Sequence, residues 1–306
     1  MLSAFTFPGQ GAQHPGMLSE LPRDSAARER IAEAEAVLGQ PLHALDSPEA
    51  LTDTRNVQLS LLISSVLWAE YLQGRGCIPD FVLGLSIGAY PAAVVAGSLA
   101  FDDALRLVDL RGRLMQQAYP SGYGMLALTG VGQTQVEAEI AEQRAEGRPV
   151  YLANLNGEQQ FVLAGCRKAM QDTAERIRAR GQCSGRLLDV PVPSHCELLA
   201  PQAERLAEAF ADVVMQAPKC GYVSAARARV LRQADAIRQD LVQNMAHQVH
   251  WHDSCRMLAE RGLDRAIEMP PGSTLTGLFR RLLPQGLCQA LATTQPAALV
   301  GYAQPD

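Results

Sequence analysis

Short apolar runs alternate with helical patterns over the first hundred residues. We predict strands at 2–7 and 81–83 and helices over 23–38 and 56–73, the second of them apolar on most of its surface. A Gly-x-Ser-x-Gly turn over 84–88 leads into a further helix. Strands that alternate with helices in this way are typical of a parallel sheet covered by helices.

The pattern changes over the middle of the chain. It predicts a strand at 125–129, a helix over 133–145, a strand at 150–155, a turn at Asn156-Gly157, a strand at 161–164, a helix over 167–180 and a strand at 186–190. This β-α-β-β-α-β order is that of ferredoxin-like domains. We therefore predict a small ferredoxin-like domain over 123–190, inserted into a large α/β domain made of 1–122 and 191–306.

The composition, with 47% apolar and 19% charged residues, is that of a globular protein. The 27 basic and 32 acidic side chains give a net charge of −5, which argues against a nucleic-acid partner. The uncharged stretch 81–101 is long enough to span a membrane, but its glycines and Pro91 favour a strand, a turn and a helix. The seven cysteines are widely spaced, and the first residues lack the basic region of a signal peptide. We expect a cytoplasmic protein with reduced thiols and no membrane segment.

Ser86 is the first candidate for chemistry, because its glycine turn joins a predicted strand to a predicted helix. In this context the motif indicates a nucleophile elbow, which exposes the serine at the end of a strand. The helix N-terminus behind the serine would offer amides to a developing oxyanion. A plain strand-to-helix connection with a capping serine is the alternative.

A glycine-containing loop follows the first predicted strand. Gly9 and Gly11 flank Gln10 and allow the backbone to approach a ligand, so the Gln10 amide is a candidate second oxyanion donor. The loop lacks the Gly-Lys-Ser/Thr sequence of a phosphate loop and the third glycine of a dinucleotide site. An ordinary loop remains the alternative.

Arg111 lies in the middle of the apolar face of a predicted helix over 102–117. A buried guanidinium needs an anion, since an unpaired buried charge costs several kcal/mol or more. Its planar fork favours a carboxylate held by two hydrogen bonds. That carboxylate belongs either to an Asp or Glu of the protein or to a substrate.

Histidines are the next candidates for chemistry: the single His195 and a later cluster of three. His195 follows the last predicted strand of the small domain, an interdomain position from which a general base could reach a serine. A surface loop histidine is the alternative. His247, His250 and His252 lie close in sequence, but their spacing matches no zinc signature and lacks an evident carboxylate, so we predict no metal.

Six stretches together resemble the malonyl-CoA:acyl-carrier-protein transacylase family, in the right order and over nearly the whole chain. They are FPGQGAQ (7–13), GLSIGAYPAAVVAGSL (84–99), VDLRGRLMQQAYPSGYGMLAL (108–128), NLNGEQQFVLAG (154–165), VPVPSHC (190–196) and PPGSTLTGL (270–278). The resemblance implies an α/β-hydrolase-like large domain with a parallel sheet and a ferredoxin-like insert.

The resemblance also implies roles for site residues. Ser86 would be the acylated nucleophile, His195 its base and Arg111 the receptor of the malonyl carboxylate. Gln10 and Ile87 would offer backbone amides to the oxyanion, and the backbone carbonyl of position 250, here His250, would orient the base. The sequence departs from the family pattern at Leu85 (usually His), Gln248 (usually Pro), His250 (usually Gln) and Pro270 (usually Gly).

The Leu85 variant and the helix that follows it look most similar to the malonyltransferase (epsilon) subunit of bacterial malonate decarboxylase. That resemblance implies malonyl-CoA and the decarboxylase's acyl carrier subunit as partners, possible contacts with its other subunits, and no cofactor beyond the carrier's own thiol prosthetic group. A transacylase of fatty-acid or polyketide synthesis is one alternative, and a serine esterase or thioesterase is another. For carrier docking, the sequence offers two basic groups: Arg176, Arg178, Arg180 and Arg186, and the pair Arg280-Arg281.

Overall fold

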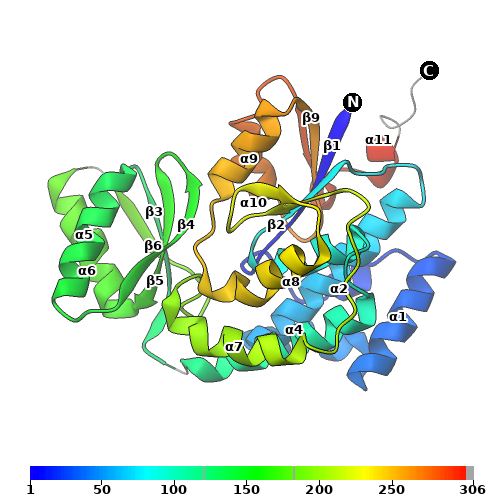
Figure 1. Ribbon diagram of the computed structural model, residues 1–306, viewed down its shortest axis with the longest axis horizontal. Coiled ribbons are helices and arrows are strands. Elements are labelled where there is room, and N and C mark those ends of the chain that lie inside the picture. The colour runs from blue at the N-terminus through cyan, green and yellow to red at the C-terminus, as the bar shows by residue number, and fades with distance from the viewer. Residues whose placement is uncertain (120, 182, 301–306) are drawn as a thin grey trace.

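The computed structural model describes residues 1–119, 121–181 and 183–300, which form two β-sheets with flanking helices (Figure 1). The large sheet has the strand order β10-β9-β1-β2-β7-β8 and is parallel except for β8. Its strands are β1 (Leu2–Phe7), β2 (Phe81–Gly84), β7 (Gly221–Ser224), β8 (Arg229–Leu231), β9 (Leu263–Glu268) and β10 (Leu287–Ala290). The predicted parallel, helix-covered α/β sheet is confirmed.

Helices cover both faces of the large sheet because successive strand residues point to opposite sides. Phe5 and Phe7 of β1 face one layer, and Ala4 faces the other. The first layer contains α1 (Ser25–Leu38), α2 (Thr54–Gln73), α3 (Ala89–Val95), α4 (Phe101–Ala118), α7 (Ala200–Ala209), α8 (Ala234–Gln243) and the short α11 (Pro296–Val300). The second contains α9 (Trp251–Glu260) and α10 (Thr274–Arg280).

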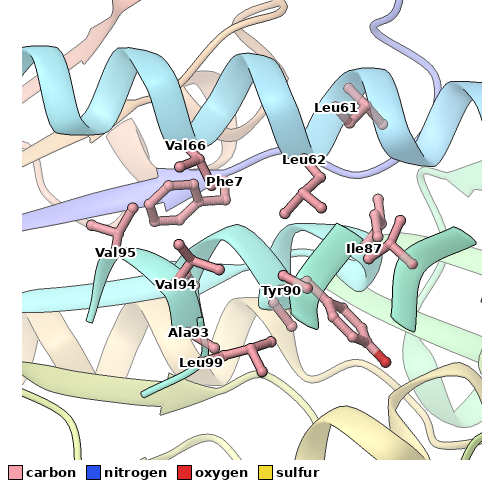
Figure 2. Packing of buried hydrophobic residues seen from close by; sticks show 14 of the residues in the cluster. Phe7, Leu61, Leu62, Val66, Ile87, Tyr90, Ala93, Val94, Val95 and Leu99 are labelled. Carbon is pink, nitrogen blue, oxygen red and sulfur yellow. The ribbon is translucent and has the colours of Figure 1, made fainter. Parts of the chain in front are cut away.

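The first layer holds the larger core. Figure 2 shows Phe7 of β1 packed among Val66 of α2 and Val94 of α3, with Ile87 and Tyr90 farther along the same cluster. Ile87 and Tyr90 are fully buried. The backbone around Ser86 is therefore anchored in the core by the residues that follow it.

The small sheet lies beside the large one and is antiparallel, with the order β4-β5-β3-β6 (Figure 1). Its elements are β3 (Tyr123–Thr129), α5 (Gln133–Ala145), β4 (Val150–Gly157), β5 (Gln160–Cys166), α6 (Arg167–Arg180) and β6 (Ser184–Leu187). Apolar residues of α5 and α6 pack on one face of the sheet. This is the ferredoxin-like arrangement. The predicted domain boundaries at 123 and 190 stay predictions.

Two local predictions in the small sheet were wrong. The hairpin turn is formed by Glu158 and Gln159, because Asn156-Gly157 still belong to β4 and Gly157 pairs with Gln160 after a register shift. The last strand is Ser184–Leu187 and not 186–190. Its residues are mostly exposed at the sheet edge, so its position is set by hydrogen bonding to β3 and not by apolar alternation.

Backbone hydrogen bonds join the small sheet to the large domain. Val249 donates to the Ala153 carbonyl at 2.8 Å and accepts from the Leu155 amide at 2.8 Å, beside an isolated bridge with Asn154. This contact places the chain segment before α9 directly against strand β4. No helix within the described ranges is long and apolar enough to cross a membrane.

Candidate active site

Ser86 lies on a sharp turn between β2 and α3, with a positive φ of 55° that non-glycine residues rarely adopt. The two flanking glycines are required by space. A Cβ on Gly84 would lie 2.1 Å from the Gly88 carbonyl, and a Cβ on Gly88 would lie 2.2 Å from the Phe7 carbonyl oxygen. The turn is thus a strained strand-to-helix elbow, with the serine only partly buried.

The loop that carries Gln10 packs against this elbow. The Leu85 amide donates to the Phe7 carbonyl at 2.9 Å, and a Cβ on Gly9 would lie 3.1 Å from the Leu85 carbonyl oxygen. The sequence predicts that the backbone amides of Gln10 and Ile87 bind an oxyanion, and the contact brings their two segments together at the serine. That role remains a prediction.

Arg111 of α4 is fully buried and reaches the elbow. Its Nη1 donates to Gln58 Oε1 at 2.6 Å, and its Nη2 donates to Asn244 Oδ1 at 3.2 Å and to Ser86 Oγ at 3.4 Å. The guanidinium carbon lies 5.8 Å from the centre of the Tyr90 ring. Burial lowers the Arg111 pKa to about 10, which leaves the side chain protonated at neutral pH.

The partners of Arg111 are neutral. Within the part of the chain that the structure describes, its Nε has no hydrogen-bond partner and no Asp or Glu pairs with it. Its charge is held by amide oxygens, a hydroxyl and an aromatic ring. The site can therefore accept an external carboxylate next to the serine hydroxyl.

Close packing of α2 against α4 creates this arrangement. Gly112, the residue after Arg111, faces the backbone of α2, and a Cβ there would lie 2.4 Å from Arg55 Cα. The absence of a side chain at Gly112 lets the two helices approach until Gln58 reaches the guanidinium.

His195 is 3% exposed and has a φ of 65°. Its Nδ1 donates to the backbone carbonyls of Asn244 at 2.9 Å and His247 at 3.2 Å, and its own amide donates to the Met245 carbonyl at 2.7 Å. With Nδ1 carrying the hydrogen, Nε2 keeps its lone pair and can accept a proton. Burial, followed by the charge of Arg111, lowers the His195 pKa to about 4, so the imidazole is neutral at physiological pH.

The prediction for His250 was wrong. The His250 carbonyl accepts from the Ser254 amide at 3.0 Å and from Ser254 Oγ at 2.7 Å, in the first turn of α9. The carbonyls that orient the imidazole belong to Asn244 and His247, because His250 has already turned away to cap the next helix.

Sequence reasoning missed Gln58 and Asn244, which hold Arg111 between them. Gln58 is fully buried on α2, a helix predicted as broadly apolar. Like Arg111, it is a polar side chain on an apolar helix, which needs a buried hydrogen-bond partner and could have been noticed for that reason. Asn244 contacts two site residues at once, through its side chain to Arg111 and its carbonyl to His195. No sequence pattern marks it, since it acts from a short 3₁₀ turn (Asn244–Ala246) after α8.

A pocket of about 580 Å³ opens beside His195, between the small sheet and the large domain. Its walls include Arg144 and Tyr151 from the small sheet side and His247 and Gln248 from the other. A second pocket, of about 620 Å³, lies around Phe101 at the far end of α4 and contains none of the predicted site residues. Of these two pockets, the one beside His195 is lined by predicted site residues, His195 and His250.

The histidine cluster has no metal-binding geometry. Among the residues described, no three His, Cys, Asp or Glu side chains are placed to hold one ion. His250 faces Asp253, with 3.7 Å between Nδ1 and the carboxylate, whereas His252 lines a separate pocket beside the β4–β5 turn.

Comparisons with known proteins agree with this architecture. The acyl transferase domain family matches residues 4–306. The malonyl CoA-acyl carrier protein transacylase of Salmonella typhimurium is 38% identical over 302 residues, covering 97% of each chain. A solved structure of the malonyl CoA-acyl carrier protein transacylase from Coxiella burnetii has a TM-score of 0.91 at 33% identity, covering 99% of this chain and 96% of that one.

A third relative was solved together with a carrier. It is a malonyl-transacylase in complex with its type II PKS acyl-carrier protein, with a TM-score of 0.91, 34% identity and 99% coverage of both chains. With matches of this identity over nearly its full length, the chain is an acyltransferase that belongs to the malonyl-CoA:acyl-carrier-protein transacylase family.

Proposed function

We propose that this protein transfers a malonyl group from malonyl-CoA to the thiol of an acyl carrier protein, through an ester on Ser86. One observation carries the proposal: a fully buried Arg111 with neutral partners lies 3.4 Å from the Ser86 hydroxyl. Malonyl has a free carboxylate one methylene away from its thioester carbonyl. A cation beside the nucleophile therefore binds that carboxylate while the carbonyl meets the serine oxygen.

In the first half-reaction, Ser86 Oγ attacks the thioester carbonyl and His195 Nε2 takes the serine proton. The Asn244 and His247 carbonyls keep the opposite nitrogen protonated, so the imidazole presents the correct tautomer. The backbone amides of Gln10 and Ile87 would stabilise the oxyanion. The tetrahedral intermediate collapses, the C–S bond breaks, and the coenzyme A thiolate leaves with the proton that His195 returns.

In the second half-reaction, the carrier thiol gives its proton to His195 and attacks the malonyl ester. The C–O bond to Ser86 then breaks, the serine oxygen recovers the proton and the malonyl thioester departs on the carrier. The residues alone perform this chemistry, and we propose no cofactor beyond the two thiol substrates. The name of the carrier complex among the relatives supports an acyl carrier as the acceptor.

We further propose that the acceptor is the carrier subunit of a malonate decarboxylase, which this chain would serve as its malonyltransferase subunit. The support is the resemblance at Leu85 and the helix after it. A Cβ on Gly9 would lie 3.5 Å from the Leu85 side chain, so Leu85 places an apolar group beside the Gly9 backbone. A carrier of fatty-acid or polyketide synthesis is the competing acceptor. The relatives favour it, because they include a malonyl CoA-acyl carrier protein transacylase and a complex with a type II PKS acyl-carrier protein.

Intact-mass analysis tests the proposal. The protein mixed with malonyl-CoA should gain one malonyl group, and Ser86→Ala should gain none. Ser98→Ala is the matched control, because Ser98 is a fully buried serine outside the site, and this variant should be acylated as wild type is. A malonyl adduct on Ser86→Ala would refute the nucleophile assignment.

Acceptors are compared by adding each to the acylated protein. Loss of the malonyl group to the decarboxylase carrier supports the narrower proposal, and loss only to a fatty-acid-synthesis carrier refutes it. Rapid loss to water without any carrier would instead identify an esterase.

A further inference from the structure

Asp240 is a buried carboxylate that the proposed mechanism does not use. It is 4% exposed on α8 and accepts hydrogen bonds from two hydroxyls of β7: Tyr222 Oη at 2.9 Å and Ser224 Oγ. Both donors are fully buried. Burial raises the Asp240 pKa, whereas the two hydroxyls oppose this shift. The three side chains form a clamp, here called the Asp240 clamp, that fixes α8 to the sheet.

The two ends of the Asp240 clamp are connected to opposite sides of the active site. Strand β7 pairs with β2, which runs directly into the Ser86 elbow. Asn244 lies one helical turn after Asp240, and its carbonyl accepts from His195 while its side chain accepts from Arg111.

A second contact holds the last turn of α8. Tyr90, four residues after Ser86, donates from its hydroxyl to the Leu241 carbonyl at 3.1 Å. Helix α8 is thus tied to the strand beside the elbow and to the helix that follows the elbow, which leaves Asn244 little freedom relative to Ser86.

We infer that Asp240 is a positioning residue for acyl transfer: through Ser224 and Tyr222 it sets the place of Asn244, and Asn244 aligns His195 and Arg111 on Ser86. Asp240 is no third member of a serine–histidine–acid triad, because carbonyl oxygens occupy the Nδ1 side of His195. The inference rests on the proposed function for its kinetic consequences, and its structural content stands apart from that function.

Single-turnover acylation by malonyl-CoA and by acetyl-CoA tests the Asp240 clamp. Ser224→Ala and Tyr222→Phe each remove one hydroxyl and should slow malonyl transfer about tenfold, while Asp240→Ala should slow it about 100-fold, as small misplacements of catalytic groups do. The Tyr222→Phe/Ser224→Ala double variant should match Asp240→Ala, because both remove the same two bonds. Each variant should also lose part of the preference for malonyl over acetyl, since Arg111 moves with Asn244.

The matched control is Thr276→Val. Thr276 also donates a hydroxyl to a buried carboxylate, Glu268, and fixes α10 to β9 away from His195 and Arg111. This variant should keep the wild-type ratio of malonyl to acetyl rates. Equal losses in Thr276→Val and Ser224→Ala, or an unchanged ratio in all Asp240-clamp variants, would overturn the inference.

A second readout needs no activity. In protein labelled with ¹⁵N-histidine, the His195 Nδ1–H signal, assigned by its absence in His195→Gln, should shift in Ser224→Ala and Tyr222→Phe and stay in place in Thr276→Val. An unmoved signal in the two Asp240-clamp variants contradicts the inference. Failure of wild type to take up malonyl would refute the proposed function and leave this test valid.

Discussion

Arg111 donates to the side-chain oxygen of Gln58 at 2.6 Å, so the most deeply buried cation of the site rests on a neutral amide. An Asp at that position would neutralise the guanidinium and compete with any substrate carboxylate. The Gln58 amide orients the guanidinium without neutralising its charge. The guanidinium thereby stays a desolvated positive charge beside Ser86 that no carboxylate of the described residues neutralises.

Removal of this charge should change which acyl group is chosen. A charge-assisted bidentate pair in a dry site contributes roughly 2–4 kcal/mol, so Arg111→Ala should lose about 30- to 1,000-fold in kcat/KM for malonyl-CoA. Acetyl-CoA lacks the carboxylate and should lose little. Arg111→Lys should restore little, because a point charge does not reproduce the fork.

Single-turnover acylation of Ser86 with both thioesters measures the effect of the Arg111 variants. An equal loss on both substrates would assign Arg111 a structural role. A well-folded alanine variant that still prefers malonyl would mean that the carboxylate binds elsewhere.

The rate of Ser86 acylation should stay high down to an unusually low pH. Because the His195 pKa is lowered from 6.5 to about 4, Nε2 stays able to accept a proton through pH 6 and 5, and the rate should fall only near pH 4. Arg111→Ala removes one cause of the low value and should move this limb to higher pH. The rate of Ser86 acylation against pH is the measurement, and a wild-type limb near pH 6.5 would contradict the assignment.

The same shift should affect stability. The unfolded chain binds a proton at His195 below about pH 6.5, and the folded chain binds it only near pH 4, so stability from this residue is lost as pH falls through that window. The loss amounts to about 3 kcal/mol at its limit. Urea unfolding of wild type and His195→Gln between pH 7 and 4.5 measures it, and parallel curves for the two proteins would contradict it.

Gly88→Ala should destabilise the fold by about 3 kcal/mol or more, because the new Cβ would lie 2.2 Å from the Phe7 carbonyl oxygen. Gly277→Ala is the matched control. Gly277 is exposed within α10 with open space around its Cβ position, and alanine there should leave stability unchanged or raise it by up to about 1 kcal/mol. Urea unfolding compares the two, and equal stabilities would show that the backbones near Ser86 can separate at little cost.

The two basic groups considered for carrier docking differ in the structure. Arg176 and Arg180 contact Glu139, which is fully buried, together with other acidic residues of the small domain. Arg178 and Arg186 of the same group, and both arginines at the end of α10, Arg280 and Arg281, are exposed and have no ion-pair partner within the described ranges. We favour the Arg280-Arg281 pair for carrier docking, because neither of its members is held in an ion pair among the described residues, whereas two members of the first group are.

Arg281→Glu should raise KM for the carrier roughly threefold to tenfold without changing KM for malonyl-CoA. Arg178→Glu, an exposed reversal in the last turn of α6, is the control and should change neither. Steady-state kinetics with each substrate varied in turn measures both KM values. An equal rise in KM for the carrier and for malonyl-CoA in Arg281→Glu would contradict docking at this pair.

The sequence predicted those features that depend on periodicity. Arg111 was found because a single charge interrupted an apolar helical face, and the ferredoxin-like order followed from alternating short patterns. Asn244 could not be found this way, since its role depends on where α8 ends in space. His250 was assigned from the register of a motif, and in the structure the orienting carbonyls belong to residues three and six positions earlier, His247 and Asn244.

The two backbone hydrogen bonds between Val249 and strand β4 couple local unfolding of the small sheet to the active site. Residues 244–249 supply the carbonyls that orient His195, and the same segment covers the otherwise open edge of the small sheet. Fraying of that edge therefore also releases the acceptors of the imidazole. Amide hydrogens of β4 and of residues 244–249 should exchange with one shared opening free energy, as a single cooperative unit.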